Sequence, residues 1–282
     1  MLIKQMDDDI KARASRTWNS SAAGAAHAPG LNPGSKEFFD TVVERRSSYE
    51  LPWLQQLIPF SATAGQSVLE LGCGAGYDAL FFCRSGADYT GVDIAPLNPI
   101  RTRQHLDFFG YCPKLLQADV ESLPFTSSVF SVIYSFGVLH HTDMRKSLGE
   151  AARVLKPGGK LWLVVYHRNS IFYWLKLFLT DHIYNRGYLK QSFEQRLSRI
   201  EFNVAGELPL VQVYSRREIR RLIRNAGFHV RCVKTRKLLK EDLPSLPILD
   251  NLWRFLPQPW LDLVARRFGW YLIIQATRPE LG

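Results

Sequence analysis

The chain has 282 residues, of which 46% are hydrophobic, 12% aromatic and 22% charged. This balance is typical of a packed globular protein and excludes an intrinsically disordered chain, because enough apolar side chains are present to form a core. The length suits one large α/β domain with insertions or two small domains. The four cysteines are too few for a disulfide scaffold and form no CxxC pair, so we expect no zinc ribbon, redox motif or metal site.

The net charge of +10 is distributed unevenly along the chain. Residues 1–141 hold 11 Lys and Arg against 14 Asp and Glu, whereas residues 142–282 hold 25 against 12. The basic second half has two interpretations. It indicates an anionic partner (a phosphate-bearing or carboxylated substrate, nucleic acid, or an acidic membrane surface), or it is only a solvated basic face.

No segment has the pattern of a secretory signal or of a membrane span. The first nine residues carry three acids and no long apolar core. The longest apolar cluster, at about 171–179, contains Lys176 and is too short to cross a bilayer. We therefore expect a cytoplasmic protein without a transmembrane segment.

The first 60 residues differ in pattern from the rest. Residues 1–35 contain small-residue and turn-forming stretches, at 20–30 and 32–34, and are expected to be loosely ordered. Between residues 35 and 58 apolar residues recur at helical spacing, which predicts one or two helices before the main domain.

From residue 67 onward, strand and helix patterns alternate. The predicted strands cover residues 67–71, 88–93, 114–119, 129–135 and 160–166, and the predicted helices cover 77–84, about 99–109 and about 144–155. This alternation predicts right-handed βαβ crossovers and a doubly wound parallel sheet of the α/β class. In such a sheet the ligand binds at the carboxyl ends of the strands.

After Tyr166 the pattern breaks for about 45 residues, in which aromatic and basic residues mix. Regularity returns at Ser215 and Glu218, whose spacing is that of a capping box, and the helix that follows is predicted to end at Gly227. Residues 229–233 and 271–276 predict a sixth and a seventh strand. A Pro-rich aromatic segment and an amphipathic helix, about 252–267, lie between them.

A glycine-rich loop follows the first predicted strand. Gly72, Gly74 and Gly76 stand at alternate positions two residues after Glu70, and glycines let the backbone turn sharply and approach a ligand closely. The dinucleotide spacing needs a third glycine where Tyr77 stands. The loop therefore favours a different nucleoside ligand.

Acids at consecutive strand ends support this interpretation. Asp93 ends the second strand, where a carboxylate can accept hydrogen bonds from both ribose hydroxyls. Asp119 ends the third and can accept from an adenine amino group, with Ile94 and Val120 as apolar walls, and Glu70 lies close to where a cationic amino-acid moiety would bind. A single acid is more often a helix cap or a solvated loop residue, but three in order at consecutive strand ends predict a nucleoside site.

Residues from about 66 to 166 resemble the class I S-adenosylmethionine-dependent methyltransferases, of the small-molecule type seen in ubiquinone/menaquinone and natural-product methylation. The motifs that carry the resemblance are Glu70-Leu-Gly-Cys-Gly-Ala-Gly76, Gly91-Val-Asp93, Gln117-Ala-Asp119-Val-Glu-Ser-Leu-Pro-Phe125, Ser135-Phe-Gly-Val-Leu-His-His141 and Leu155-Lys-Pro-Gly-Gly159. One departure is Ser131, where the family often has Asp; that position supports the sheet edge, so the departure scarcely affects the expected activity.

The resemblance implies a Rossmann-like seven-stranded sheet of order 3-2-1-4-5-7-6 whose last strand is antiparallel. It also implies S-adenosyl-L-methionine as cofactor and S-adenosyl-L-homocysteine as product. The residues expected to bind the cofactor are Tyr49, Glu70, Gly72, Cys73, Gly74, Gly76, Asp93, Ile94, Asp119, Val120 and Ser135.

The resemblance also divides the chain. Residues 1–60 are expected to form a helical lid segment, in which Trp18 and Tyr49 can close over the cofactor or simply pack. Residues 61–282 are expected to form the methyltransferase domain. Inserts at about 167–214 and 239–268 are expected to select the acceptor, because their aromatic content suits an apolar or sugar-like molecule.

Two histidines are the candidate catalytic residues. His140 and His141 follow the fourth strand, where cofactor and acceptor meet, and a neutral imidazole can act as a base near physiological pH. The alternative is that one of them only packs the loop. Tyr166 and His167, after the fifth strand, are the next candidates.

We interpret the chain as a methyltransferase for a small-molecule acceptor, anionic or aromatic, with an oxygen as the methylated atom. Natural products, sugar or polysaccharide precursors and quinone-like rings are the candidate acceptors. The alternatives are an RNA methyltransferase that uses the basic second half, which is disfavoured because no RNA-binding module precedes the core, and a catalytically silent cofactor-binding partner. The apolar cluster at 171–179 can also rest on a membrane surface. The oligomeric state stays open.

Overall fold

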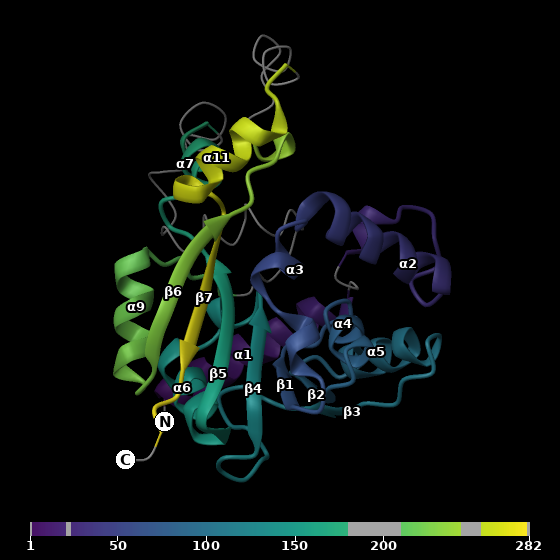
Figure 1. Cartoon of the computed structure of the whole chain (residues 1–282), viewed down its shortest axis with the longest axis vertical. Helices are drawn as coiled ribbons and strands as arrows, with labels where there is room; N and C mark the ends of the chain where they lie inside the picture. The colour runs from purple at the N-terminus through teal and green to yellow at the C-terminus, as the bar shows by residue number, and fades with distance from the viewer. Residues whose placement is uncertain (1, 21–23, 180–209, 244–254, 281–282) are drawn as a thin grey trace.

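The computed structural model describes residues 2–20, 24–179, 210–243 and 255–280 (Figure 1). Its centre is a seven-stranded sheet of order β3-β2-β1-β4-β5-β7-β6, which confirms the predicted order. The first five strands pair in parallel, and β7 pairs antiparallel with both β5 and β6. The strands are β1 (Ser67–Leu71), β2 (Asp88–Asp93), β3 (Lys114–Gln117), β4 (Phe130–Phe136), β5 (Leu155–Tyr166), β6 (His229–Arg236) and β7 (Tyr271–Thr277).

Helices cover both faces of the sheet. Successive side chains of a strand point to opposite faces, so each strand contributes apolar side chains to the core on either face. In β1, Leu69 and Leu71 share a core with α6 (Met144–Val154) and α9 (Arg216–Asn225). Val68 instead belongs to the core on the other face, which holds side chains of α3 (Leu54–Leu57), α4 (Ala79–Arg84) and α5 (Leu97–Asp107). The loops that lead from each parallel strand to the next helix lie at the carboxyl edge of the sheet.

The local signals in the sequence located most elements, with shifted ends. β2 has the predicted bounds, whereas α5 begins and ends two residues before the predicted helix, and β5 begins at Leu155 because that residue already pairs with Phe130. The predicted capping box is confirmed, since Ser215 and Glu218 each bond the other's backbone N–H at the start of α9. Gly227 follows this helix with φ +89°, as its predicted role at the end of the helix requires.

The expectation that residues 1–35 are loosely ordered is wrong for Leu2–Ser20, which form a helix. Residues Leu2–Ser20 form α1, followed by η1 (Ala25–His27), α2 (Lys36–Arg45), η2 (Arg46–Glu50), α3 and η3 (Phe60–Thr63). The guanidinium of Arg101 on α5 donates to the carbonyls of Trp18 (3.1 Å) and Asn19 (2.8 Å) and so satisfies the last turn of α1. This contact joins residues more than 80 positions apart, so the local pattern could not show it.

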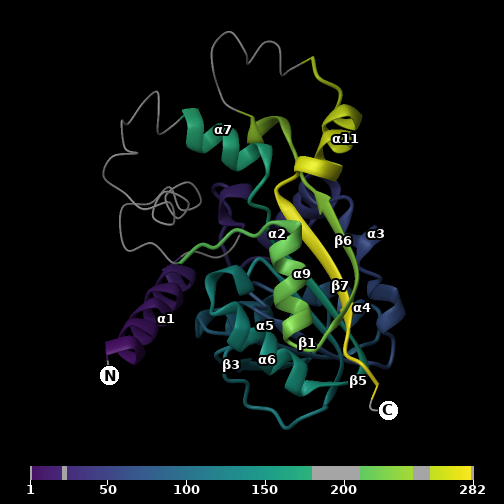
Figure 2. The same cartoon turned by 90° about the vertical axis from the view of Figure 1, so that its left-hand side faces the viewer.

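A smaller layer lies beyond the sheet. Helices α7 (Ile171–Leu179) and α11 (Gln258–Phe268) stand at one end of the molecule in both views (Figures 1 and 2), and η7 (Lys240–Asp242) precedes α11. The described part of the helix predicted at about 252–267 starts at Gln258, and most of the predicted 167–214 insert lies outside the described residues. Among the helices that the structure describes, none is long and apolar enough to span a bilayer.

Candidate functional site

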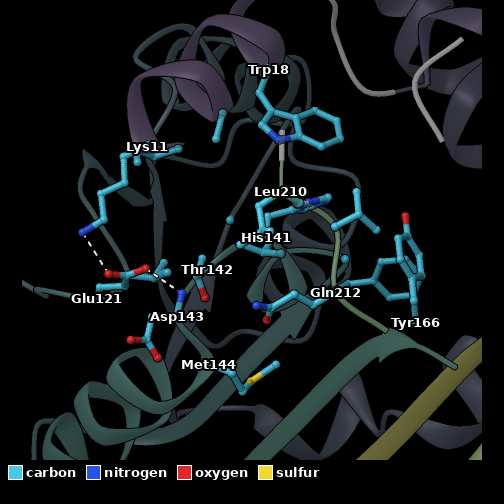
Figure 3. A pocket seen from close by; sticks show the side chains of 18 of the residues that line it. Lys11, Trp18, Glu121, His141, Thr142, Asp143, Met144, Tyr166, Leu210 and Gln212 are labelled. Atoms are coloured by element: carbon cyan, nitrogen blue, oxygen red, sulfur yellow. Dashed lines mark hydrogen bonds and ion pairs between the residues drawn. The ribbon is translucent and has the colours of Figure 1, made fainter. Parts of the chain in front are cut away.

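A cavity of about 820 Å³ opens at the carboxyl ends of the five parallel strands, β1 to β5 (Figure 3). The loops after these strands form its floor, and α1 and residues 210–214 form its walls. Figure 3 shows Lys11 on one side reaching towards Glu121, with Trp18, His141 and Tyr166 along the rest of the wall. The predicted carboxyl-edge ligand position therefore coincides with an open pocket.

The glycine-rich loop forms part of the pocket floor. Both Gly72 (φ +84°) and Gly74 (φ +55°) have a left-handed backbone. A Cβ on Gly72 would lie 2.1 Å from Cγ2 of Val138, so this glycine allows the loop after β4 to pack closely. A Cβ on Gly74 would meet no protein atom within 4 Å, so Gly74 leaves room that a ligand can fill.

Asp93 stands at the end of β2 and faces this loop. Its two carboxylate oxygens accept backbone N–H bonds from Gly74 (3.0 Å) and Ala95 (2.9 Å). Burial nevertheless raises the pKa of Asp93 above its usual 3.8. The side chain of Asn98 also bonds this carboxylate, which has about four acceptor sites, so it can still accept a hydroxyl hydrogen bond from a ligand.

Asp119, after β3, interacts with the N-terminal helix. Nζ of Lys11 lies 2.6 Å from Oδ2 of Asp119 and 2.9 Å from Oε2 of Glu121. Partial burial lowers the pKa of Lys11, but hydrogen bonds and charge from both carboxylates raise it above 10.5, so the amine stays protonated. Helix α1 is thus tied to the acid that the sequence analysis assigned to adenine.

Arg46 is a pocket residue that the sequence analysis missed. Its Nη2 lies 2.7 Å from Oδ2 of Asp78, which also accepts a hydrogen bond from the hydroxyl of Tyr134 (2.7 Å). Its guanidinium lies 4.4 Å from the ring centroid of Phe136. Burial lowers the pKa of Arg46, but the charge of Asp78 raises it above its usual value. No local signal could identify Arg46, since Asp78 is 32 residues away in the sequence.

The histidine pair is divided between the core and the pocket. His141 lines the cavity, and its Nδ1 lies 2.5 Å from the carbonyl oxygen of Leu210, so Nδ1 carries the proton that is donated. Its Nε2 then carries the lone pair, and burial lowers the pKa of His141 to about 4. His140 is fully buried and does not line the cavity. Its ring packs against that of Tyr166, with 3.8 Å between the ring centroids. The pKa of His140 is lowered well below 6.5 by burial and then by His141.

Six of the eleven predicted cofactor residues line the cavity. They are Gly72, Gly74, Asp93, Ile94, Asp119 and Val120. Trp18 and Tyr166 line it as well, and the ring of Trp18 meets that of His141 at 5.6 Å between centroids. The structure therefore brings together the strand-end acids, the loop glycines and one histidine.

The other five predicted cofactor residues do not line the cavity. Glu70 is buried and accepts a hydrogen bond from the hydroxyl of Tyr89, and burial and then the charge of Asp78 raise its pKa well above 4.5. Ser135 is buried and donates to the carbonyl of Leu71 (3.0 Å). Of the remaining three, Cys73 is buried, Gly76 packs against Thr102, and the hydroxyl of Tyr49 donates to Glu241. The candidate base His167 is also buried, with its Nδ1 3.1 Å from the carbonyl oxygen of Gly269.

The side chains of Glu70, Ser135 and Tyr49 are bound by partners that do not line the pocket. Strand ends alternate in direction, so neighbours of a ligand-facing residue face the core. The glycine pattern predicted the position of the loop, but it does not show which side of the backbone each residue faces. No group of three His, Cys, Asp or Glu that could hold a metal ion occurs among the described residues.

Comparisons with known proteins agree on one family. A profile of the family described as "Methyltransferase domain" matches residues 69–163. An uncharacterised methyltransferase of Synechocystis sp. is 30% identical over 149 residues, which cover 45% of this chain and 68% of that protein. The demethylmenaquinone methyltransferase of Thermus thermophilus is 34% identical over 116 residues, which cover 40% of this chain and 53% of that protein. This chain thus spans about half the length of the Thermus protein.

A solved structure resembles almost the whole chain. Geranyl diphosphate C-methyltransferase from Streptomyces coelicolor, in complex with Mg²⁺, geranyl diphosphate and S-adenosyl-L-homocysteine, superposes with a TM-score of 0.60. The match covers 95% of this chain and 97% of that chain at 14% sequence identity. At this identity the likeness concerns the fold alone.

Proposed function

Because the chain belongs to the class I S-adenosylmethionine-dependent methyltransferases, we propose that it methylates a hydroxyl oxygen of an apolar small molecule. The observation that carries the proposal is a single cavity in which strand-end acids and glycines occupy one side and aromatic and aliphatic side chains the other. Of the candidate acceptors, an apolar natural product and a quinone-like ring fit this cavity better than a sugar or polysaccharide precursor. The name of the Thermus relative, a demethylmenaquinone methyltransferase, supports the quinone-like class.

The residues of the first side suit S-adenosylmethionine. Asp93 would accept from the ribose hydroxyls, Asp119 from the adenine amino group, and Gly74 leaves the space that the methionine part needs. The guanidinium of Arg46, which also lines the cavity, would hold the methionine carboxylate. When bound, the cofactor supplies a methyl group on a positively charged sulfur. Residues 1–60 would act as its lid, since Lys11 and Trp18 of α1 form part of the wall.

The second side suits an apolar acceptor. Phe136, Val138, Met144 and Tyr166 line it, and an apolar ring can bury its surface against them. The exclusion of water by such walls favours methyl transfer, because a desolvated hydroxyl is a better nucleophile once its proton is removed.

His141 is the proposed general base. Its Nδ1–H donates to Leu210, which fixes the ring. Its buried Nε2 would take the acceptor's hydroxyl proton as the new O–C bond forms and the methyl–sulfur bond breaks. Burial lowers the pKa of His141 to about 4, which keeps the imidazole neutral at physiological pH and also makes it a weaker base than a free imidazole. His140 would support this arrangement by packing beneath His141, where the ring centroids lie 4.1 Å apart.

Two measurements test the proposal. Calorimetric titration of the purified chain with S-adenosylmethionine and S-adenosylhomocysteine should give binding in the micromolar range or tighter, and absence of both would contradict the cofactor assignment. Transfer of a labelled methyl group to a panel of quinols, phenols and glycosides should then yield an O-methyl product. Cofactor binding with no turnover on any acceptor would favour a catalytically silent partner, and methylated RNA would favour the RNA alternative.

A further inference from the structure

The most exposed apolar side chains of the described residues gather at one end of the molecule. Among large hydrophobic residues there, only four are 60% exposed or more: Trp174 (68%), Phe255 (83%), Trp260 (66%) and Leu263 (60%). Trp174 lies on α7, Phe255 just precedes α11, and the other two lie on α11. Elsewhere in the described chain the highest value is 53%, at Ile100. Single exposed apolar residues are ordinary, but a gathering of this size marks an interaction surface.

Helix α11 presents two opposite apolar faces. Leu261 and Ala265 are buried in a small core that also contains Leu238 and Leu243. Trp260, Leu263 and Val264 follow the spacing i, i+3, i+4 and stay exposed on the other face. The inner face already holds the helix in place, so the outer face is not needed for folding.

The polar residues around this outer face make it cationic. Arg266 and Arg267 are exposed in the last turn of α11. Asp262 is the acid of α11, and Arg216, whose side chain donates to the carbonyl of Arg266 (2.6 Å), adds a third cation at this turn. An apolar face with Trp at its edge and arginines beside it fits the boundary of an anionic lipid bilayer, where indole rings bind at the headgroup level.

This end of the molecule is joined to the pocket by stacked rings. Tyr166 lines the cavity and stacks on Trp270 (5.3 Å between centroids), which stacks in turn on Phe172 of α7 (4.1 Å). Figures 1 and 2 place α7 and α11 together beyond the end of the sheet at which β5 finishes. The surface and the acceptor side of the cavity therefore share one layer of aromatic side chains.

We propose that the outer face of α11, formed by Trp260, Leu263 and Val264 with Phe255, docks onto an anionic lipid bilayer. If the proposed methylation of an apolar acceptor holds, docking would place the aromatic side of the pocket next to the membrane that dissolves such an acceptor. A nucleic acid is a poorer occupant, because it offers no apolar phase for the exposed Leu263 and Val264.

Co-sedimentation of the full chain with vesicles tests the docking directly. The chain should bind vesicles of phosphatidylglycerol and phosphatidylcholine, and bind pure phosphatidylcholine more weakly. Leu263→Asp should weaken binding to the mixed vesicles by about tenfold or more, because the apolar side chain no longer enters the bilayer and a charge is added. Arg267→Glu should weaken only the phosphatidylglycerol-dependent part.

Ile100→Asp is the matched control, since Ile100 is a similarly exposed aliphatic residue on α5, away from α11. It should bind vesicles as the unchanged chain does. S-adenosylhomocysteine affinity, measured on every variant, should not change, which separates docking from folding and from the cofactor assignment. Vesicle binding does not depend on catalysis, so it can succeed where the proposed function fails.

Three results would overturn the proposal. The first is no sedimentation of the unchanged chain with mixed vesicles. The second is equal vesicle binding by the unchanged chain and Leu263→Asp. The third is a concentration-dependent dimer, or an RNA complex, that Leu263→Asp abolishes while no vesicle binding is found; the face would then join two copies or bind RNA.

Discussion

The two sides of the cavity are built in different ways. The side assigned to the cofactor uses residues that follow three consecutive strands, from Gly72 to Val120. The side assigned to the acceptor combines residues as distant as Phe136, Tyr166 and Val213, with α1 covering both. The first side is made by the way parallel strands end, and the second by contacts between segments that only folding brings together.

The two sides of the cavity should therefore tolerate amino-acid substitution to different degrees. A strand-end carboxylate or a left-handed glycine has a position set by its own strand, so any chain with this sheet presents it in the same place. The aromatic side can be rebuilt by other side chains of similar size without disturbing the sheet. We therefore expect the acceptor to depend mainly on residues from Phe136 onward, and the cofactor mainly on residues before it.

Arg46→Ala is expected to have the largest effect, and it is on stability. Removal of the guanidinium leaves the carboxylate of Asp78 buried without its cation, which costs about 3–5 kcal/mol. Denaturant unfolding measures this loss. The neighbouring Arg45→Ala is the control, with a cost below about 1 kcal/mol, because its ion pair with Glu50 is exposed on the arginine side. Equal costs for the two variants would show that the N-terminal segment contributes no buried pair to the fold.

Asp93→Asn should weaken S-adenosylhomocysteine binding by about 100-fold and also lower stability, because the amide nitrogen cannot accept one of the two backbone N–H bonds. The amide keeps the shape of the side chain but loses the charge and one acceptor oxygen, and hydrogen bonds to a charged acceptor contribute about 1.5–3 kcal/mol each. Calorimetry checks the affinity. Asp88→Asn, at the exposed start of the same strand, should bind as the unchanged chain does. If Asp93→Asn also retains full affinity, the ribose assignment is wrong.

His141→Gln should lower the turnover number by about 100-fold while cofactor affinity is kept, because only proton removal is lost. The measurement is the rate of labelled methyl transfer at saturating cofactor. His140→Gln should instead lower the melting temperature, since the amide replaces a fully buried ring. A normal rate in His141→Gln would move the base to Tyr166, the other candidate on the cavity wall.

The smallest expected effect is on the pH dependence of cofactor affinity. The pKa of Asp93 is raised by burial, so acidification converts its carboxylate to the acid at a pH above the usual 3.8. Affinity for S-adenosylhomocysteine should therefore fall as the pH is lowered, beginning at a higher pH than an unshifted aspartate would give. The loss stays smaller than in Asp93→Asn over the range in which the carboxylate is only partly protonated. A pH profile that is the same in Asp93→Asn and in the unchanged chain would assign the titration to another group.

The sequence alone predicted much of the cofactor side. Alternating strand and helix patterns located the five parallel strands, and the resemblance of the motifs to a known family supplied the order of all seven. Gly72, Gly74, Asp93 and Asp119 were found because local rules act on them: a left-handed turn needs glycine, and a ligand at the carboxyl edge needs a side chain at a strand end.

The same local rules gave wrong predictions for residues one or two positions before the ligand-facing ones. Glu70 and Ser135 precede or follow ligand-facing positions, and in the folded protein Tyr89 and the Leu71 carbonyl bind them inside the core. The order of α1 was missed for a related reason, since its last turn is satisfied by Arg101 of another helix.

The rest of the pocket depends on contacts between segments that are distant in the sequence. Arg46 reaches Asp78, Lys11 reaches Asp119, and His141 rather than His140 faces the cavity. Backbone position follows from nearby residues, because turns, caps and strand ends are formed by short-range interactions. The partner of a long side chain depends on which distant segments pack together, and this depends on the burial of apolar surface by the whole chain.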